Sequence, residues 1–214
     1  MKKILSLILV VIMLLSVCSC GGDNNSTGTT ESPKEIEYIA AEKAYTELIE
    51  AHNLCVSAMD SIYGAWYFSI YEYDDYYGTS GFNEFCDKAN VDPTELINAI
   101  SDFAGYSVSK STAYGLFEEF DYSTYFVGIV LKNNGTYEKI NGHLASAKES
   151  LKSVTNEYSD YTGYSVLKSY YSEIKAYGEF CESPTGSFSQ LKTTVDNYET
   201  NLRNYKNDLS FIFE

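Results

Sequence analysis

The chain offers few side chains that could bind a metal ion. It has two histidines, and His52 stands three residues before Cys55, a spacing that could supply two ligands from one helical turn. No close second pair of His or Cys residues completes such a site, and His143 stands alone. His52 also falls on an apolar helical stripe, where a histidine is more often a core residue with one hydrogen bond. We therefore expect no metal and no other cofactor.

The candidates for nucleophilic or acid–base catalysis are equally sparse. Beyond the N-terminal region the chain has three cysteines, Cys55, Cys86 and Cys181. In an exported protein two of them could form a disulfide, which would leave one free thiol, and the sequence leaves the pairing open. No serine lies in a nucleophile elbow, and no glycine-rich phosphate loop follows a strand. These absences favour a binding function over catalysis.

The segment "IYGAWYFSIYEYDDYYG", residues 62–78, has aromatic residues on every side of its predicted helix. Burial among several neighbouring helices, with tyrosine hydroxyls at the margins, is the favoured interpretation for most of it. The part after Glu72 should be exposed, and its acids would favour a basic or hydroxyl-rich partner. We call this candidate contact region the Tyr-acid surface; it comprises Tyr71, Glu72, Tyr73, Asp74, Asp75, Tyr76 and Tyr77.

The charge balance excludes one class of partner. The chain has 15 basic and 30 acidic residues. Lys2 and Lys3 stand among the first 19 residues, which contain no acid, so the remaining residues are more acidic than the formal charge of -15 suggests. Such a surface repels phosphate groups, so we expect no nucleic-acid partner and no unaided adsorption to anionic lipid.

The first 20 residues combine three features of an export signal. A short basic start, "MKK", precedes the apolar run "ILSLILVVIMLLSV", and a cysteine follows where a small-residue cleavage site would otherwise stand. The stretch "VCSC", residues 17–20, resembles the lipobox of bacterial lipoproteins, with Val17 at the aliphatic position and Ser19 at the small one. The alternative frame, ending at Cys18, would put Val17 where a small residue is required.

The resemblance implies where the protein is located. Residues 1–19 would be a lipoprotein signal peptide, and Cys20 would carry the diacylglyceryl group after cleavage. Residues 20–34 would form the lipidated N-terminus and a flexible tether, because residues 21–33 are small and polar. Residues 35–214 would form one domain, held by the lipid bilayer on the outer, extracytoplasmic face of the bacterial membrane.

Apolar residues after Glu35 recur at alternating steps of three and four, which predicts helices. One stripe extends from Tyr45 to Tyr73 and should end near Gly78 and Gly81. Further helices are predicted over 140–161, 166–181 and 188–212, a capped one starts at Asp92 and Pro93, and an aromatic-rich one covers 111–132. No segment shows the period of a strand. The fold class is therefore all-α, a bundle of about five to six mostly antiparallel helices.

Two segments resemble each other: "NAISDFAGYSVSKS" (98–111) and "NEYSDYTGYSVLKS" (156–169) are identical at nine of fourteen positions. We interpret both as a corner between helices, in which Gly105 or Gly163 adopts the left-handed conformation and a serine caps the next helix. A ligand-binding motif is the alternative.

The sequence does not specify a biochemical activity. It favours an anchored binding or interaction module whose ligand is an unidentified protein or carbohydrate. Two alternatives remain open: a helical hydrolase that cleaves cell-wall or sugar polymers with a carboxylate pair, and a structural or assembly protein with an exposed heptad stripe on its last helix.

Overall fold

The computed structural model describes residues 33–154 and 162–213, and in this part it contains helices and no strand. The predicted all-α fold is confirmed, although the eight α-helices described exceed the five or six expected. The predicted signal peptide, Cys20 and most of the predicted tether lie outside the described residues. The α-helices are α2 (Pro33–Tyr71), α3 (Gly78–Lys88), α4 (Pro93–Ala104), α5 (Lys110–Tyr114), α6 (Phe120–Asn133), α7 (Thr136–Ser153), α8 (Thr162–Glu182) and α9 (Phe188–Phe213), with 3-10 turns at Tyr73–Asp75 and Gly115–Glu118.

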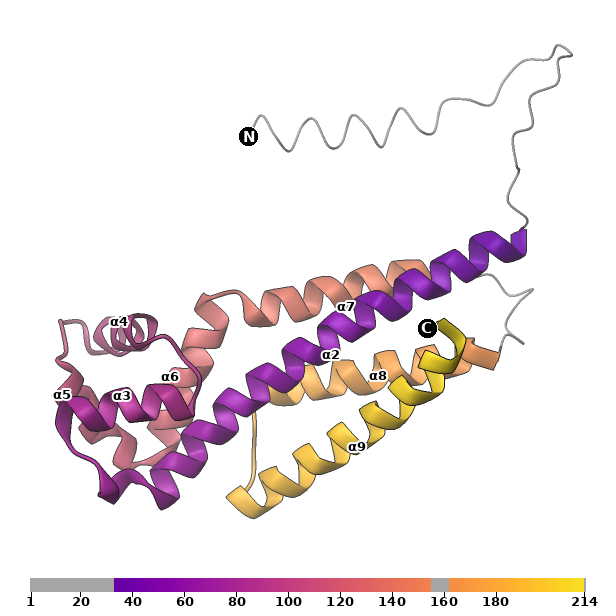
Figure 1. The fold of residues 1–214 in the computed structure, drawn as a ribbon. Helices are drawn as coiled ribbons and strands as arrows, with labels where there is room; N and C mark the ends of the chain where they lie inside the picture. Colours follow the sequence, from indigo (N-terminus) through magenta and orange to yellow (C-terminus); the bar gives the residue numbers. More distant parts are fainter. Residues whose placement is uncertain (1–32, 155–161, 214) are drawn as a thin grey trace, which may run out of the picture. The chain divides into compact units, whose positions relative to one another are not determined.

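The longest helix, α2, packs against most of the others. Its most extensive partner is α7, and it also contacts α6, α8 and α9. Figure 1 shows α7, α8 and α9 alongside α2, with successive helices alternating in direction. The predicted stripe of α2 is in the core and is widened by alanines, which let neighbouring helices approach closely; its buried members include Ala44, Tyr45, Leu48, Ala51, Cys55, Ala58, Met59, Ile62, Ala65 and Trp66.

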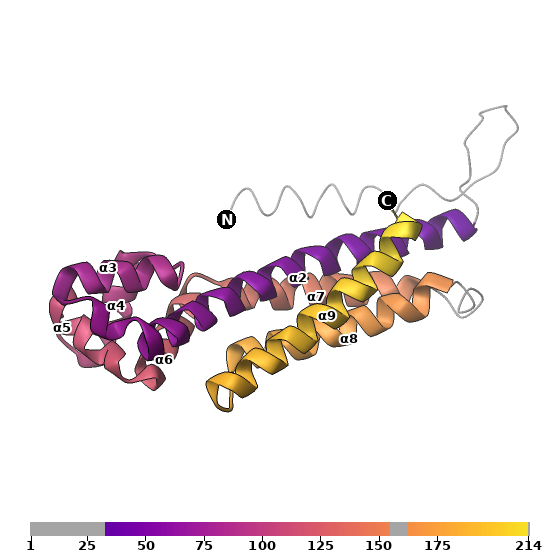
Figure 2. The same ribbon diagram turned by 60° about the horizontal axis from the view of Figure 1, so that its bottom comes forward.

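The apolar stripe of the last helix, α9, is buried in the core. Leu191, Val195, Leu202 and Leu209 are all buried, and α9 packs mainly against α8. In Figure 2 α9 lies beside α8 and α2. The stripe is therefore not the exposed heptad face that a role in assembly would need.

The short helices contain two departures from prediction. The helix α3 was not predicted, because Gly78 and Gly81 were interpreted as breakers. Gly78 does adopt a left-handed φ of 57°, but Gly81 lies inside α3 beside the ring of Tyr114. A Cβ atom at Gly81 would collide with that ring, so this glycine permits close packing and does not end a helix.

The second departure is the predicted helix over 111–132. The structure divides it into α5, the 3-10 turn at Gly115–Glu118, and α6. The turn places Phe117 in the core, where its ring lies 3.9 Å from that of Phe85 and parallel to it within 19°. One continuous helix would have carried the aromatic residues around all its sides, and the break lets them reach the core.

The first copy of the repeated segment forms the predicted corner. There Gly105 ends α4 with a φ of 75°, and the Ser109 side chain accepts a hydrogen bond from the backbone N–H of Thr112. In the second copy Gly163 lies in the first turn of α8, so the predicted left-handed role of Gly163 is wrong. Residues 162–169, the described part of the second copy, therefore differ in local structure from the equivalent residues 104–111.

Candidate functional site

The Tyr-acid surface begins at the last residue of α2 and continues to the start of α3. Tyr114 of α5 holds the backbone of this segment, because its hydroxyl donates hydrogen bonds to the carbonyl oxygens of Tyr73 and Tyr76. The rings of Tyr73 and Tyr114 also stack, with centroids 4.8 Å apart. Burial and, to a lesser extent, the nearby Tyr73 and Asp74 raise the pKa of Tyr114 to about 12. Its hydroxyl therefore remains a hydrogen-bond donor at neutral pH.

Two further side chains fix this segment to its neighbours. Glu72 forms an ion pair with Lys88 at the end of α3, with 3.0 Å between the carboxylate oxygen and Nζ. The ring of Tyr76 stacks on Phe68, with centroids 5.8 Å apart. Glu72, Tyr73 and Tyr76 are therefore half-buried, so the expected exposure after Glu72 is wrong for both tyrosines.

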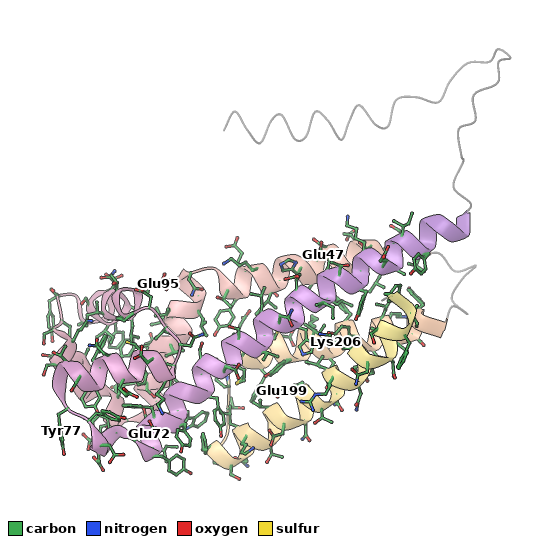
Figure 3. The ribbon with its side chains drawn as sticks, viewed as in Figure 1. Glu47, Glu72, Tyr77, Glu95, Glu199 and Lys206 are labelled. Carbon is green, nitrogen blue, oxygen red and sulfur yellow. The ribbon has the colours of Figure 1, made fainter. Side chains whose placement is uncertain are left out.

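The other four side chains of the Tyr-acid surface point to solvent. Tyr71 and Tyr77 are 58% and 78% exposed, and Asp74 and Asp75 are exposed between them in the sequence. No lysine or arginine within the described residues pairs with either aspartate. Figure 3 shows Glu72 and Tyr77 at the same end of α2. The segment therefore presents two free carboxylates and two accessible rings on a backbone that its other side chains hold.

A row of rings continues along α2 beyond the predicted surface, with Tyr67 and Tyr71 exposed and Tyr63 half-buried. Tyr63, Tyr67 and Tyr71 follow at steps of four, and neighbouring rings in this row lie 6.5 Å and 4.9 Å apart. Phe188, the first residue of α9, packs against all three at 5.1 to 6.3 Å. The periodicity showed that Tyr67 and Tyr71 exceed what one buried face needs, but the contribution of Phe188 depends on the packing of α9.

Sequence reasoning missed a second group of exposed aromatic residues. Phe103 and Tyr106, at the end of α4, are 59% and 66% exposed, and Tyr122 and Tyr125 of α6 are 41% and 50% exposed. Phe103 packs edge-on against Tyr125, with centroids 5.8 Å apart. A period-based search could not separate these rings from the core residues of the same helices.

Tyr125 also lines a pocket of about 810 Å³. The pocket collects three carboxylates, Asp121, Glu138 and Glu182, together with Lys132. Glu182 accepts a hydrogen bond of 3.3 Å from the side chain of Asn141. This is the concave, polar place where the carboxylate-pair alternative would have its site.

His52 has the structural role that its position predicted. It is half-buried, and its Nδ1 lies 2.7 Å from the hydroxyl oxygen of Tyr170 on α8. Burial and, to a lesser extent, the positive charge of Lys206 lower the pKa of His52 to about 4. The imidazole is therefore neutral at pH 7. Among the described residues no group of three or more His, Cys, Asp or Glu side chains is arranged to hold a metal ion.

Comparison of the chain with models of protein families, with curated proteins and with solved structures gave no match. Within the described part of the chain, no helix combines the length and the apolar character that crossing a membrane requires.

Proposed function

We propose that this chain is a lipid-anchored binding module on the outer face of a bacterial membrane. Cys20 carries the anchor, and the Tyr-acid surface contacts a partner that presents basic groups. The anchor is supported by the resemblance of "VCSC" to a lipobox. The contact surface is supported by one observation above the others: Asp74 and Asp75 have no cationic partner in the described part and lie between two exposed rings.

The held backbone supports binding because it lowers the cost of association. A flexible segment loses conformational entropy when a partner orders it, whereas this one is already fixed by Tyr114, Glu72 and Tyr76. Exposed tyrosines supply rigid contact area with few rotatable bonds. Two carboxylates add a preference for positive charge and faster association at low salt.

The same acids contribute little to the fold. Asp74 and Asp75 are in a short 3-10 turn just after α2, where no lysine or arginine of the described chain neutralises them and no side-chain cap is present. In a chain with twice as many acidic as basic residues, such charges repel their neighbours. Their removal should therefore leave stability equal or slightly higher, which separates a binding role from a structural one.

The anchor is tested by substitution of Cys20. The Cys20→Ala variant should leave the membrane fraction or accumulate as the unprocessed precursor, and it should not incorporate labelled fatty acid. The Cys18→Ala variant is the matched control and should behave as the wild type. The opposite pattern would show that lipidation occurs at Cys18.

The contact surface is tested by a photo-crosslinking amino acid in the full chain, displayed on cells. Placed at Tyr77, it should capture a discrete partner, and the crosslink should be lost when Asp74→Asn and Asp75→Asn are added. Tyr106 is the matched control, because it is a tyrosine of similar exposure, 66% against 78%. A crosslink at Tyr106 with none at Tyr77 would move the contact to the α4–α6 aromatic residues and contradict the proposal.

A further inference from the structure

The fold brings together two of the three cysteines that the described residues contain. Cys55 on α2 and Cys181 on α8 are 126 residues apart, and both side chains are completely buried. The Cys181 thiol lies 3.5 Å from the carbonyl oxygen of Cys55, to which it donates a hydrogen bond.

The two helices are closely packed at this point. The Cys55 thiol lies 3.9 Å from the carbonyl oxygen of Ile174, one turn earlier on α8 than Gly178. Gly178 has no side chain to separate the helices, and a Cβ atom there would lie 3.6 Å from the Cys55 sulfur. Each thiol therefore lies against the backbone of the other helix, which places the two side chains at one close approach of α2 and α8, as a disulfide requires.

We infer that Cys55 and Cys181 form a disulfide when the chain folds in the presence of a disulfide oxidant. One thiolate attacks the oxidant, for which oxidised glutathione serves as the probe, and releases one reduced glutathione. The second cysteine thiolate then attacks the mixed disulfide and releases another. The two protein thiols are oxidised to one disulfide, and one glutathione disulfide is reduced to two thiols.

The third cysteine has no such partner in its surroundings. Cys86 lies on α3, and the charged groups nearest to it are Lys110, Asp87 and Asp92. Burial raises the pKa of Cys86 to about 12, which suppresses its thiolate. The odd cysteine of the sequence is therefore assigned to Cys86, which remains a thiol.

Burial also determines when the bond forms. In the folded protein neither Cys55 nor Cys181 is accessible to an oxidant. The pKa of the Cys181 thiol is raised well above its ordinary range by its hydrogen bond with Cys55 and by burial. Oxidation should therefore be fast during folding and slow once the native helices have packed.

The test uses the full chain, solubilised in non-ionic detergent, unfolded in urea with a reductant and then refolded with a glutathione redox pair. Remaining thiols are alkylated, and the protein is cleaved after glutamate, which separates Cys55 from Cys86 because Glu72 and Glu84 lie between them. Mass spectrometry should find the Cys55 and Cys181 peptides linked and lighter by two hydrogen atoms, and the Cys86 peptide alkylated. Recovery of Cys55 and Cys181 as alkylated or glutathione-bound peptides, or a bond to Cys86, would overturn the inference.

A second measurement compares the stability of the oxidised and the reduced chain. The wild-type chain refolded with the glutathione pair should unfold at higher urea concentration than the same chain kept reduced. The Cys86→Ser variant should show the same difference, and Cys181→Ala should show none. A difference that persists in Cys181→Ala would also overturn the inference. Neither measurement depends on lipidation or on the Tyr-acid surface. Failure of the disulfide inference would therefore leave the proposed function standing, and failure of the proposed function would leave the disulfide inference standing.

Discussion

The buried imidazole of His52 predicts a specific loss of stability in mild acid. Folding lowers the pKa of His52 from 6.5 to about 4, because burial and Lys206 disfavour the charged form. Between these pH values the unfolded chain binds a proton that the folded chain does not. Stability is therefore complete above pH 6.5 and falls as the pH drops toward 4. Tyr170 of α8 contacts the imidazole, and Lys206, labelled in Figure 3, acts on it from α9.

The size of the effect follows from the two pKa values. Each pH unit between them corresponds to about 1.4 kcal/mol, which limits the total to about 3.4 kcal/mol and the loss between pH 7 and pH 5 to about 2 kcal/mol. Solvent reaches part of the ring, so we expect a loss of about 1–2 kcal/mol over this range. Protonation of Asp60 and Glu199 acts in the opposite direction, because burial raises the pKa of both carboxyls.

The assay therefore compares variants at each pH. Urea unfolding can be followed by the fluorescence of Trp66, which is the single tryptophan of the chain and is 4% exposed. Relative to wild type, His52→Gln should lose less stability between pH 7 and pH 5, by about 1–2 kcal/mol. His143→Gln removes the other histidine, whose Nδ1 lies 2.7 Å from a Glu47 carboxylate oxygen, and should not reduce the loss. Equal losses in wild type and His52→Gln would refute the argument.

Two further predictions concern the backbone. Gly64→Ala should destabilise the protein by about 1–3 kcal/mol, because the new methyl group would collide with the carbonyl oxygen of Lys88, whereas Gly128→Ala in the interior of α6 meets nothing and should be neutral or stabilising by about 0.5–1 kcal/mol. Asp92→Ala should cost about 1 kcal/mol, because the Asp92 carboxylate accepts hydrogen bonds of 2.7 and 3.0 Å from the backbone N–H groups that begin α4. Thermal unfolding of each variant checks the glycine prediction and the Asp92 prediction. A Gly64→Ala variant as stable as Gly128→Ala would contradict the glycine prediction.

The features that sequence predicted well are local ones. The stripes of α2 and α9 and the cap at Asp92 depend on residues within a few positions of each other. The structure confirms them, except that α2 ends at Tyr71, before Tyr73, the last residue of its predicted stripe. Helix α3 was missed although Phe82, Phe85 and Cys86 carry a helical spacing. Its two glycines outweighed that signal, because the reason for Gly81 is the ring of Tyr114, more than 30 residues away.

The candidate site shows the same limit more sharply. Their aromatic and acidic composition identified the seven residues of the Tyr-acid surface as a group, but the division between held and exposed side chains is decided by Tyr114, Lys88 and Phe68. Likewise, the stripes placed Cys55 on a buried face, but its neighbour on α8 depends on where two helices cross. A helical pattern specifies which side of a helix faces inward, and only the packing specifies what lies opposite. Pairings between helices, whether of thiols or of a hydroxyl with a backbone carbonyl, are therefore the part of this protein's chemistry that the three-dimensional structure adds.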